Sequence, residues 1–328
     1  MAFEVNPTPK DSLIFLDAGT VQWGDLSFDE ISRLGNLKVY SRTNPQEVEA
    51  RSRTADILIT NKCRFTRELL SRLKRLKLIC IAATGTNNAD LEAARCFGIA
   101  VTNVSGYSTE TVVQFTFAFL LALAGNLVKY NEATHDSRWS HSPFFTLPTF
   151  PIEEIRGKTL GIVGYGKIGK QVAQIAKAFG MRVLVAKIPG RNYSLRGNPA
   201  RISLDALLRK SDFVTLHAPL TPLTECLVNS KTLRKMKRGA FLINMARGGL
   251  VDERALCRAL KSGQLAGAAT DVLNEEPPPK NHPLLTAPNF LLTPHVAWAS
   301  REARVRLVHE IALNIKAFQN GQRRNRVV

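Results

Sequence analysis

The sequence contains no apolar run long enough to cross a membrane. Its longest apolar stretch covers residues 115–124, is interrupted by Thr116 and falls short of the roughly 20 residues that a bilayer requires. The N-terminal segment MAFEVNPTPKDS also lacks the basic and then apolar regions of a secretory signal. We therefore expect no membrane partner and a cytoplasmic location.

Cysteine is scarce, and its spacing argues against two classes of site. The five cysteines form no CxxC pair and no Cys/His cluster with metal-ligand spacing, which disfavours both a zinc site and a disulfide framework. We expect no metal, and we interpret all five residues as reduced structural thiols: Cys63, Cys80, Cys96, Cys226 and Cys257. Redox sensing by one of them is the alternative, and it would need an exposed and electropositive position.

Acidic residues are outnumbered in this chain. There are 27 Asp and Glu residues against 45 Lys and Arg residues, which gives a net charge of +18. Such a charge attracts nucleic acid, acidic surfaces or anionic metabolites. The basic residues are nevertheless spread along the chain and do not alternate with aromatic residues as in nucleic-acid-binding modules. We interpret most of them as solvated helix faces and a frayed tail. Nucleic-acid binding and steering of an anionic substrate or cofactor are the alternatives.

What the sequence does contain is a regular alternation of short and long apolar patterns. Short runs rich in β-branched residues alternate with longer stretches of helical periodicity, which is typical of parallel sheets flanked by helices. The 328 residues, 45% of them hydrophobic, suffice for about two domains. Strands are expected in two series, at 13–16, 37–40, 57–60, 76–82 and 99–104, and then at 160–163, 183–186, 213–216, 240–244, 266–272 and 290–292.

Two long helices suggest how the chain is divided. The segment 109–128 has apolar residues all around a helical cylinder, so we expect one helix that is buried on several faces and bridges two domains. Another helix is expected at 300–318, with Ser300 as its N-cap. Because no strand follows it, this helix should pack back on the first domain. The expected domains are residues 1–107 with 296–328, and residues 108–295.

A strand, a glycine-rich turn and an amphipathic helix open the second series. The turn reads Gly164-Tyr165-Gly166-Lys167-Ile168-Gly169 and has the pattern GxGxxG. The first glycine of this pattern permits a tight turn, the second lets the backbone approach a pyrophosphate, and the third lets helix and strand pack closely. The helix N-terminus can supply N–H groups to the same anion. We predict a dinucleotide-binding loop, with a glycine-rich turn that holds no ligand as the alternative.

The residue that ends the next expected strand bears on which dinucleotide is bound. NAD sites usually place Asp or Glu there to bind the ribose hydroxyls, whereas this sequence has Lys187. A lysine cannot accept those hydrogen bonds, but it can pair with the 2′-phosphate of NADP, and Arg191 is close enough in sequence to assist. We therefore expect NADP(H) to be favoured over NAD(H). In the alternative, Lys187 points to solvent, and the site is indifferent or prefers NAD.

Three further motifs each follow an expected strand. In open parallel sheets the carboxyl ends of the strands line the ligand crevice, so we expect the motifs to converge on one site. They are Asn244-Met245-Ala246-Arg247-Gly248-Gly249-Leu250-Val251-Asp252-Glu253, Asp271-Val272-Leu273-Asn274-Glu275-Glu276-Pro277 and Thr293-Pro294-His295-Val296-Ala297.

The residues of these motifs suit the reduction of a 2-oxo acid. That reaction needs a cation to hold the carboxylate and polarise the carbonyl, and an acid to protonate the new alkoxide. Arg247 can supply the cation as a bidentate fork. His295 can be the acid, because imidazole changes protonation near neutral pH and a nearby carboxylate such as Glu276 favours the imidazolium. Taken singly, each residue also has an ordinary interpretation, as an ion pair, a loop charge or a structural histidine.

The order of these motifs resembles the D-isomer-specific 2-hydroxyacid dehydrogenase family over nearly the whole chain. The resemblance rests on the GxGxxG loop, on the stretch His217-Ala218-Pro219-Leu220-Thr221 and on the motifs that contain Arg247, Glu276 and His295. It implies an α/β fold class with two doubly wound parallel-sheet domains, a Rossmann NAD(P)-binding domain and a flavodoxin-like substrate domain, with the active site between them. It also implies a homodimer built around the helix near 109–128.

The resemblance further implies roles for individual residues. Arg247 would bind the substrate, and Glu276 would pair with His295, the acid/base. In the loop Ala83-Thr84-Gly85-Thr86, backbone N–H groups would hold the substrate carboxylate. Lys187 departs from the family's usual preference for NAD. The residues that match the family's cofactor contacts are Lys167, Ile168, His217, Ala218, Thr224, Met245, Arg247 and Asp271.

Two short stretches narrow the expected activity. Gly106-Tyr107-Ser108-Thr109 and Arg138-Trp139-Ser140 resemble the glycerate dehydrogenase, or hydroxypyruvate reductase, branch of the family. We therefore expect NAD(P)H-dependent reduction of hydroxypyruvate to D-glycerate or of glyoxylate to glycolate. One alternative is a dinucleotide-sensing protein with little turnover, like the related transcriptional co-repressors, and its motive is the net charge of +18. Another is a member that acts on formate or phosphite.

Overall fold

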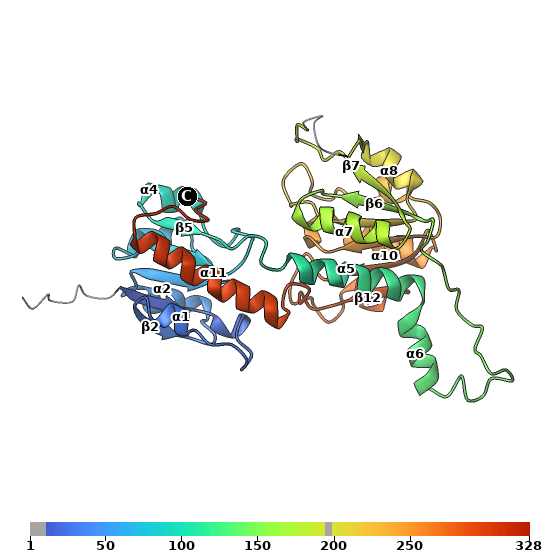
Figure 1. Ribbon diagram of the computed structural model, residues 1–328, viewed down its shortest axis with the longest axis horizontal. Helices are drawn as coiled ribbons and strands as arrows, with labels where there is room; N and C mark the ends of the chain where they lie inside the picture. Colours follow the sequence, from blue (N-terminus) through green and yellow to red (C-terminus); the bar gives the residue numbers. More distant parts are fainter. Residues whose placement is uncertain (1–10, 194–198) are drawn as a thin grey trace, which may run out of the picture. The chain divides into compact units, whose positions relative to one another are not determined.

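The computed structural model describes residues 11–193 and 199–328, and the chain divides into two compact units (Figure 1). Unit 1 consists of the chain up to Ser108 together with Ala299–Val328, and unit 2 is Thr109–Trp298. In the described part of each unit, a parallel sheet carries helices on both of its faces. This is the doubly wound α/β fold class that the sequence predicts.

The inner strands of the sheet of unit 1 are buried on both faces. Over the described residues its strand order is β2-β1-β3-β4-β5, the order of flavodoxin-like folds. The inner strands β3 and β4 read ILIT and LICI, and every residue in them is buried, as expected for parallel strands covered on two sides. The strands are β1 (Ser12–Phe15), β2 (Asn36–Val39), β3 (Ile57–Thr60), β4 (Leu78–Ile81) and β5 (Ala100–Thr102), and the helices are α1 (Asp29–Ser32), α2 (Val48–Ser52), α3 (Arg67–Arg72) and α4 (Leu91–Cys96).

The chain returns to unit 1 through one last helix, α11 (Arg301–Gln319). Ser300 caps it as predicted, and the helix packs on α1 and β4. Beyond α11 the chain runs along the edge strand β5, because Val101 donates a backbone hydrogen bond to Val328 and accepts one from Val327. The C-terminal segment therefore completes both a face and an edge of the sheet of unit 1.

The sheet of unit 2 carries a separate hydrophobic core on each face. Over the described residues its strand order is β12-β11-β10-β9-β6-β7-β8, which contains the Rossmann order around β6. Helices α5 and α7 lie side by side on one face (Figure 1), and α8, α9 and α10 cover the other. The strands are β6 (Thr159–Val163), β7 (Arg182–Ala186), β8 (Arg201–Ile202), β9 (Phe213–Leu216), β10 (Ala240–Asn244), β11 (Leu265–Thr270) and β12 (Phe290–Leu292), and the helices are α5 (Thr109–Ala124), α6 (Leu127–His135), α7 (Lys167–Ala178), α8 (Leu204–Lys210), α9 (Ser230–Leu233) and α10 (Glu253–Lys261).

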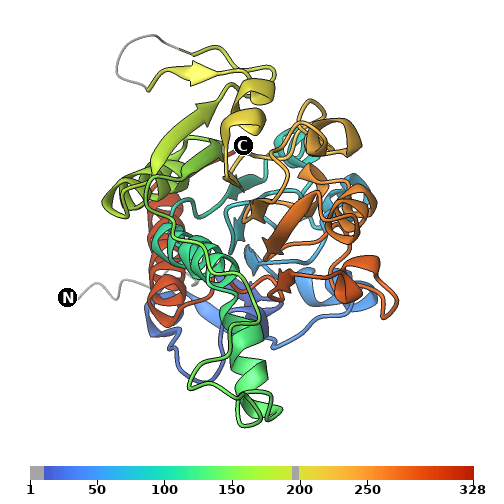
Figure 2. The ribbon, with the colours of Figure 1, turned by 90° about the vertical axis from the view of Figure 1, so that its right-hand side faces the viewer.

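The single helix predicted for residues 109–128 is wrong, because the segment forms two helices. Asn126 stands between α5 and α6 with φ 46°, in the left-handed region, and the helix axis turns by 63° at this break. Helix α5 is buried on several faces as predicted, whereas Leu127 and Val128 at the start of α6 are exposed. Figures 1 and 2 show α6 leading away from the sheet of unit 2. Within the described residues no single helix is long and apolar enough for a membrane span, and α5 and α6 meet that criterion only as a bent pair.

The described part of the second series has one strand more than predicted. Strand β8 pairs in parallel with the end of β7, with Arg201 opposite Val185 and Ile202 opposite Ala186. The sequence did not reveal β8, because two residues make no recognisable apolar run. This short strand places Arg201 beside the end of β7, where Lys187 follows.

Candidate active site

The predicted site residues of unit 2 gather along one edge of its sheet. Every pairing of neighbouring strands recorded in this sheet is parallel, so all the strands end on the same side. The residues that immediately follow the strands at that edge are Gly164 after β6, Lys187 after β7, His217 after β9, Met245 after β10, Asp271 after β11 and Thr293 after β12. The glycine loop and all three motifs therefore lie at the carboxyl ends of the strands, along one edge of the sheet.

The GxGxxG turn lies between β6 and α7, and its glycines differ in surroundings. Gly164 has φ 107°, and a Cβ there would come within 2.4 Å of the backbone of His217. A Cβ on Gly169 would lie 2.0 Å from the carbonyl oxygen of Gly164. At Gly166, the N-cap of α7, a Cβ would meet none of the described atoms within 4 Å. The open position faces the helix N-terminus, which fits a pyrophosphate held by backbone N–H groups.

The end of β7 carries a group of cations that extends beyond the predicted Lys187. The guanidinium of Arg201 lies 4.0 Å from the ring centre of Tyr193 and 5.6 Å from that of Tyr165, in the glycine loop. Side chains alternate along paired strands, so Arg201, opposite Val185, lies on the same face as Lys187. The Nε atom of Arg201 is buried and has no hydrogen-bond partner among the described residues. Lys187 itself is exposed. These cations fit an additional phosphate.

The sequence does not mark Arg201 as a site residue, because the two residues of β8 form no recognisable apolar run. Its two aromatic neighbours also come from separate segments, one in the glycine loop and one after β7. The only signal that could have identified Arg201 is a short additional strand after β7 that pairs with its end. Arg191, which the sequence placed beside Lys187, is exposed as well.

The other predicted cofactor contacts differ in exposure. Lys167 is exposed and Ile168 is partly buried at the start of α7, whereas Ala218, Thr224 and Met245 are buried. The hydroxyl of Thr224 donates to the carbonyl oxygen of Pro219 at 2.8 Å and accepts from the backbone N–H of Thr221, so it holds the turn after β9.

His217 differs from these residues because one of its ring nitrogens is buried without a partner among the described residues. Its Nε2 lies 3.0 Å from the Thr215 hydroxyl, and its Nδ1 is buried without a partner among the described residues. Burial lowers the pKa of His217 to about 3, so its imidazole is neutral at physiological pH. A neutral imidazole with an unsatisfied nitrogen can exchange a hydrogen bond with a ligand but adds no charge to the site.

Arg247 lies in the turn after β10 with most of its donors unused. Its Nη1 donates to the carbonyl oxygen of Ala246 at 2.7 Å, and the amide of Asn244 donates to the carbonyl oxygen of Arg247 at 2.8 Å. The guanidinium is half-buried and pairs with no carboxylate of the described residues. A shielded cation without a counterion favours an anionic ligand, and its planar fork matches a carboxylate.

His295 and Glu276 are in direct contact. The Nδ1 atom of His295 lies 2.6 Å from Oε2 of Glu276, and Oε1 of the same carboxylate accepts from the backbone N–H of Leu273 at 2.9 Å. The imidazole is thus oriented from one side. No described residue bonds the Nε2 atom of His295, which leaves that nitrogen for proton transfer.

Asp271 fastens the loop that carries His295. Its Oδ1 accepts from the Thr293 hydroxyl at 2.6 Å and from the N–H of Val296 at 2.8 Å, and its Oδ2 accepts from the N–H of Ala297 at 2.9 Å. His295 has φ 53°, an unusual conformation for a non-glycine residue that these bonds help to hold. Burial raises the pKa of Asp271. Both carboxylate oxygens of this predicted cofactor contact are therefore already engaged.

In unit 1, the predicted loop Ala83-Thr84-Gly85-Thr86 follows β4. The Thr84 hydroxyl donates to the carbonyl oxygen of Val104 at 2.9 Å, and the amide of Asn103 donates to the Thr84 carbonyl oxygen at 2.7 Å. The backbone N–H groups of Thr84, Gly85 and Thr86 have no partner among the described residues. Successive free N–H groups suit a carboxylate or another small anion.

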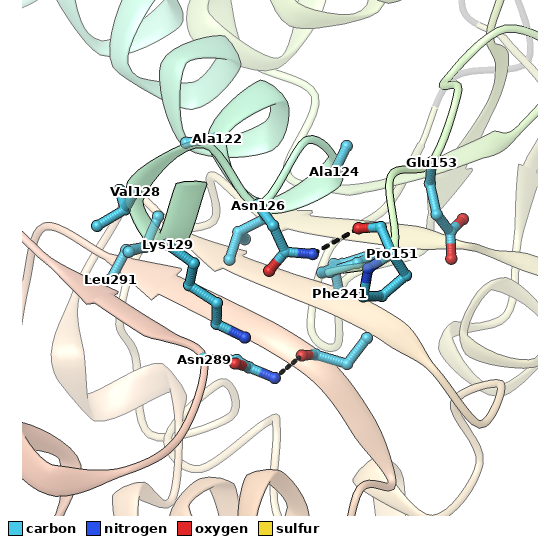
Figure 3. Close-up of a pocket in the computed structure, with 12 residues that line it drawn as sticks. Ala122, Ala124, Asn126, Val128, Lys129, Pro151, Glu153, Phe241, Asn289 and Leu291 are labelled. Atoms are coloured by element: carbon cyan, nitrogen blue, oxygen red, sulfur yellow. Dashed lines mark hydrogen bonds between the residues drawn. The ribbon is translucent and has the colours of Figure 1, made fainter. Parts of the chain in front are cut away.

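A hollow of about 200 Å³ lies away from this edge, where α5 meets α6 (Figure 3). Its lining includes Phe241 near the start of β10, Ala266 near the start of β11 and Asn289 just before β12. These are amino-terminal strand ends, so the hollow is at the opposite edge of the sheet from the motifs. Figure 3 shows Asn126 and Lys129 extending into it from the start of α6.

Known proteins resemble this chain over most of its length. Residues 117–297 match the family model described as D-isomer specific 2-hydroxyacid dehydrogenase, NAD binding domain. A glycerate dehydrogenase of Methylorubrum extorquens is 40% identical over 95% of this chain and 98% of its own. A hydroxypyruvate reductase of Blautia hydrogenotrophica is 38% identical over 94% and 97%, and a glyoxylate reductase of Aeropyrum pernix is 40% identical over 89% of each chain.

Solved structures also resemble this chain over nearly its whole length. A protein of Thermus thermophilus superposes with a TM-score of 0.86 at 37% identity, over 97% of this chain and 100% of its own. An acyclic imino acid reductase in complex with NADPH and D-Arg superposes with a TM-score of 0.85 at 31% identity, over the same shares.

Proposed function

This chain belongs to the D-isomer specific 2-hydroxyacid dehydrogenase family, and on that basis we propose that it reduces hydroxypyruvate or glyoxylate with NADPH. As a member of the family it is an NAD(P)-dependent oxidoreductase of 2-hydroxy and 2-oxo acids. The proposed products are D-glycerate and glycolate. The substrate class is supported by relatives at about the same identity that are named glycerate dehydrogenase, hydroxypyruvate reductase and glyoxylate reductase.

One observation carries the proposal furthest: a half-buried arginine that pairs with no carboxylate of the described residues lies on the same sheet edge as a Glu–His pair and the glycine loop. When bound, the reduced nicotinamide supplies the hydride. We assign to Arg247 the binding of the substrate carboxylate, and to the N–H groups of residues 84–86 a second anchor for it. His295 donates its Nε2 proton to the carbonyl oxygen as negative charge develops there, and Glu276 orients the imidazole through its contact with Nδ1.

The first test is turnover by the purified protein. Loss of nicotinamide absorbance is followed with NADPH and with NADH, against hydroxypyruvate, glyoxylate, pyruvate and phenylpyruvate. We expect the first two acids to have the highest kcat/KM. A preference for pyruvate or phenylpyruvate would overturn the substrate proposal. Tight cofactor binding without turnover of any acid would favour the dinucleotide-sensing alternative instead.

We also propose that the enzyme favours NADP(H) over NAD(H). Lys187 occupies the position where NAD sites usually carry an acidic residue, and the exposed Arg191 follows it closely. Arg201 adds a cation on the same sheet face, and its Nε has no hydrogen-bond partner within residues 11–193 and 199–328. Together they would surround a 2′-phosphate, which needs several charge-assisted donors.

We predict that Lys187→Ala and Arg201→Ala each lower kcat/KM for NADPH by about 10-fold or more, because a hydrogen bond to a charged group contributes about 1.5–3 kcal/mol. The value for NADH should change less than about twofold, since NADH has no 2′-phosphate. Steady-state kinetics with both cofactors measures the change, and Lys210→Ala, at an exposed lysine of α8, is the control. A wild-type enzyme that prefers NADH would refute this preference.

A second copy of this chain is the proposed partner. Exposed apolar side chains are concentrated between the end of α5 and the stretch that follows α6: Leu121, Leu127, Val128, Trp139, Phe144, Phe145 and Ile152. Phe145 is 94% exposed, and the 200 Å³ hollow lies at the base of this segment. Large apolar side chains gathered in one stretch favour burial against another molecule, and a twofold dimer buries the same patch twice.

We expect the Phe144→Asp/Phe145→Asp double variant to shift the molar mass in solution from dimer to monomer, because charge in an apolar interface opposes association. Light scattering after gel filtration measures the mass. Leu223→Asp replaces an exposed leucine outside this segment and is the control. A wild-type protein that is monomeric at micromolar concentration would disprove the dimer.

A further inference from the structure

The loop that carries Glu276 is held at two points by the carboxylate of Glu253, to which no role has been assigned so far. These two contacts are called the grip below. Glu253 is the first residue of α10 and lies under this loop. Its Oε1 accepts from the backbone N–H of Asn274 at 2.8 Å, and its Oε2 lies 3.1 Å from Nε2 of His282. Asn274 precedes Glu276 in the loop and His282 follows it, so one carboxylate holds the loop at both ends.

The contact with His282 is shielded and directional. The side chain of His282 is 8% exposed and that of Glu253 is 14% exposed. Nδ1 of His282 accepts from the backbone N–H of Leu284 at 3.4 Å, so Nε2 carries the proton that is donated to Glu253. The carboxylate therefore accepts at both oxygens, and each oxygen serves a different end of the loop.

The start of the loop is also held sterically against the turn that precedes α10. A Cβ on Gly248 would come within 2.1 Å of the carbonyl carbon of Leu273 and 2.3 Å of the nitrogen of Asn274. The loop backbone thus lies directly on this turn, which is where Arg247 also stands. The hydrogen bonds of Glu253 thus add to the close packing between Gly248 and the backbone of residues 273–274.

The grip is one residue away from the bond that orients Glu276. Leu273, next to Asn274, donates its N–H to Oε1 of Glu276 at 2.9 Å, and Oε2 of Glu276 lies 2.6 Å from Nδ1 of His295. A shift of the backbone at residues 273–274 would therefore move Glu276 relative to the imidazole. Misplacement by about 1 Å can cost about 100-fold in rate even when it originates away from the reacting atoms.

We propose that Glu253, with His282, is a positioning residue for the Glu276–His295 pair. The proposal rests on the function assigned to that pair above. Glu253 touches neither the glycine loop nor the cations near β7 in the described structure, because its partners are Asn274 and His282. Its effect should consequently fall on the chemical step and leave cofactor binding nearly unchanged.

The test compares Glu253→Ala with Asp252→Ala, a change of the neighbouring carboxylate. Asp252 caps α10 by accepting from the N–H of Ala255 at 2.9 Å and makes no bond to the loop, so its loss measures a purely structural effect. We expect Glu253→Ala to lower kcat by about 10- to 100-fold, with KM and Kd for NADPH within about twofold of wild type. Asp252→Ala should lower Tm but keep kcat within about twofold.

The conservative variant sharpens the comparison. Glu253→Gln keeps an oxygen for the N–H of Asn274 but cannot also accept from His282 with its amide nitrogen, so its kcat should lie between those of wild type and Glu253→Ala. His282→Ala should match Glu253→Gln, because each loses one end of the grip. Equal kcat in Glu253→Ala and Asp252→Ala would overturn the proposal.

A readout that needs no turnover separates this proposal from the proposed function. The imidazole 15N shifts of His295 report its bond to Glu276, and we expect them to change in Glu253→Ala and not in Asp252→Ala. If wild type reduces none of the acids yet these shifts move, the substrate proposal fails and the positioning role stands. If wild type is active and the shifts are unchanged in Glu253→Ala, the positioning role fails.

Discussion

Replacing His295 with Ala should lower kcat for 2-oxo acid reduction by about 100- to 10,000-fold, the usual contribution of a positioned general acid. Its Nε2 has no partner among the described residues, whereas Nδ1 is committed to Glu276. Cofactor affinity should change little, because the glycine loop and the cations after β7 stand on other strands. Stopped-flow or steady-state reduction of hydroxypyruvate measures kcat, and fluorescence titration measures Kd for NADPH.

The matched control for this variant is His141→Ala. His141 is exposed in the same unit, and its imidazole contacts the carbonyl oxygen of Ser137. This variant should keep wild-type kinetics. Turnover of His295→Ala near the wild-type value would remove His295 from the role of acid. If His295→Ala were unfolded at the assay temperature, as its Tm would show, the loss of activity would be attributed to folding.

Replacing Arg247 with Lys should lower kcat/KM for the acid by about 10- to 100-fold although the charge is retained. A lysine loses one arm of the bidentate fork, and a hydrogen bond to a charged group is worth about 1.5–3 kcal/mol. Arg247→Ala should lose more, because the substrate carboxylate would then face no cation in this turn. The loss should appear in KM for the acid and in kcat.

Arg254→Lys is the control for Arg247→Lys, since Arg254 is exposed on α10. Kinetics over a range of hydroxypyruvate or glyoxylate concentrations distinguish the two variants. If Arg247→Lys left both kcat and KM for the acid unchanged, substrate binding would have to be assigned to another cation.

The elements that could be predicted are those whose apolar pattern in the sequence shows that they are buried. Strand β3 agrees at both ends with the predicted 57–60, because an uninterrupted apolar run marks a strand buried on two faces. The break at Asn126 does have a signal in the sequence, since Gly and Asn often end a helix and Gly125-Asn126 stands there. The apolar residues that resume at Leu127 and Val128 mask this signal. Strand β8 is too short for any periodicity to reveal.

The site divides along similar lines. Residues that directly follow strands, such as Arg247 and Asp271, could be placed from strand order alone. Glu253 and His282 could not, because their contact joins positions 29 residues apart and depends on the path of a loop. The left-handed backbone of His295 is likewise invisible in the sequence, since loop hydrogen bonds impose it against the intrinsic preference of the residue.

The return of α11 and the C-terminal segment to unit 1 has a consequence for synthesis. Unit 2 is one continuous stretch and can fold once Trp298 has left the ribosome, whereas unit 1 begins first and is completed last. Until Val327 and Val328 emerge, β5 keeps an unpaired edge, and the sheet face under α11 stays uncovered. The nascent chain therefore carries an incomplete and aggregation-prone unit 1 from the synthesis of Ser108 until Ala299–Val328 appear, and this is the interval in which a chaperone would matter most.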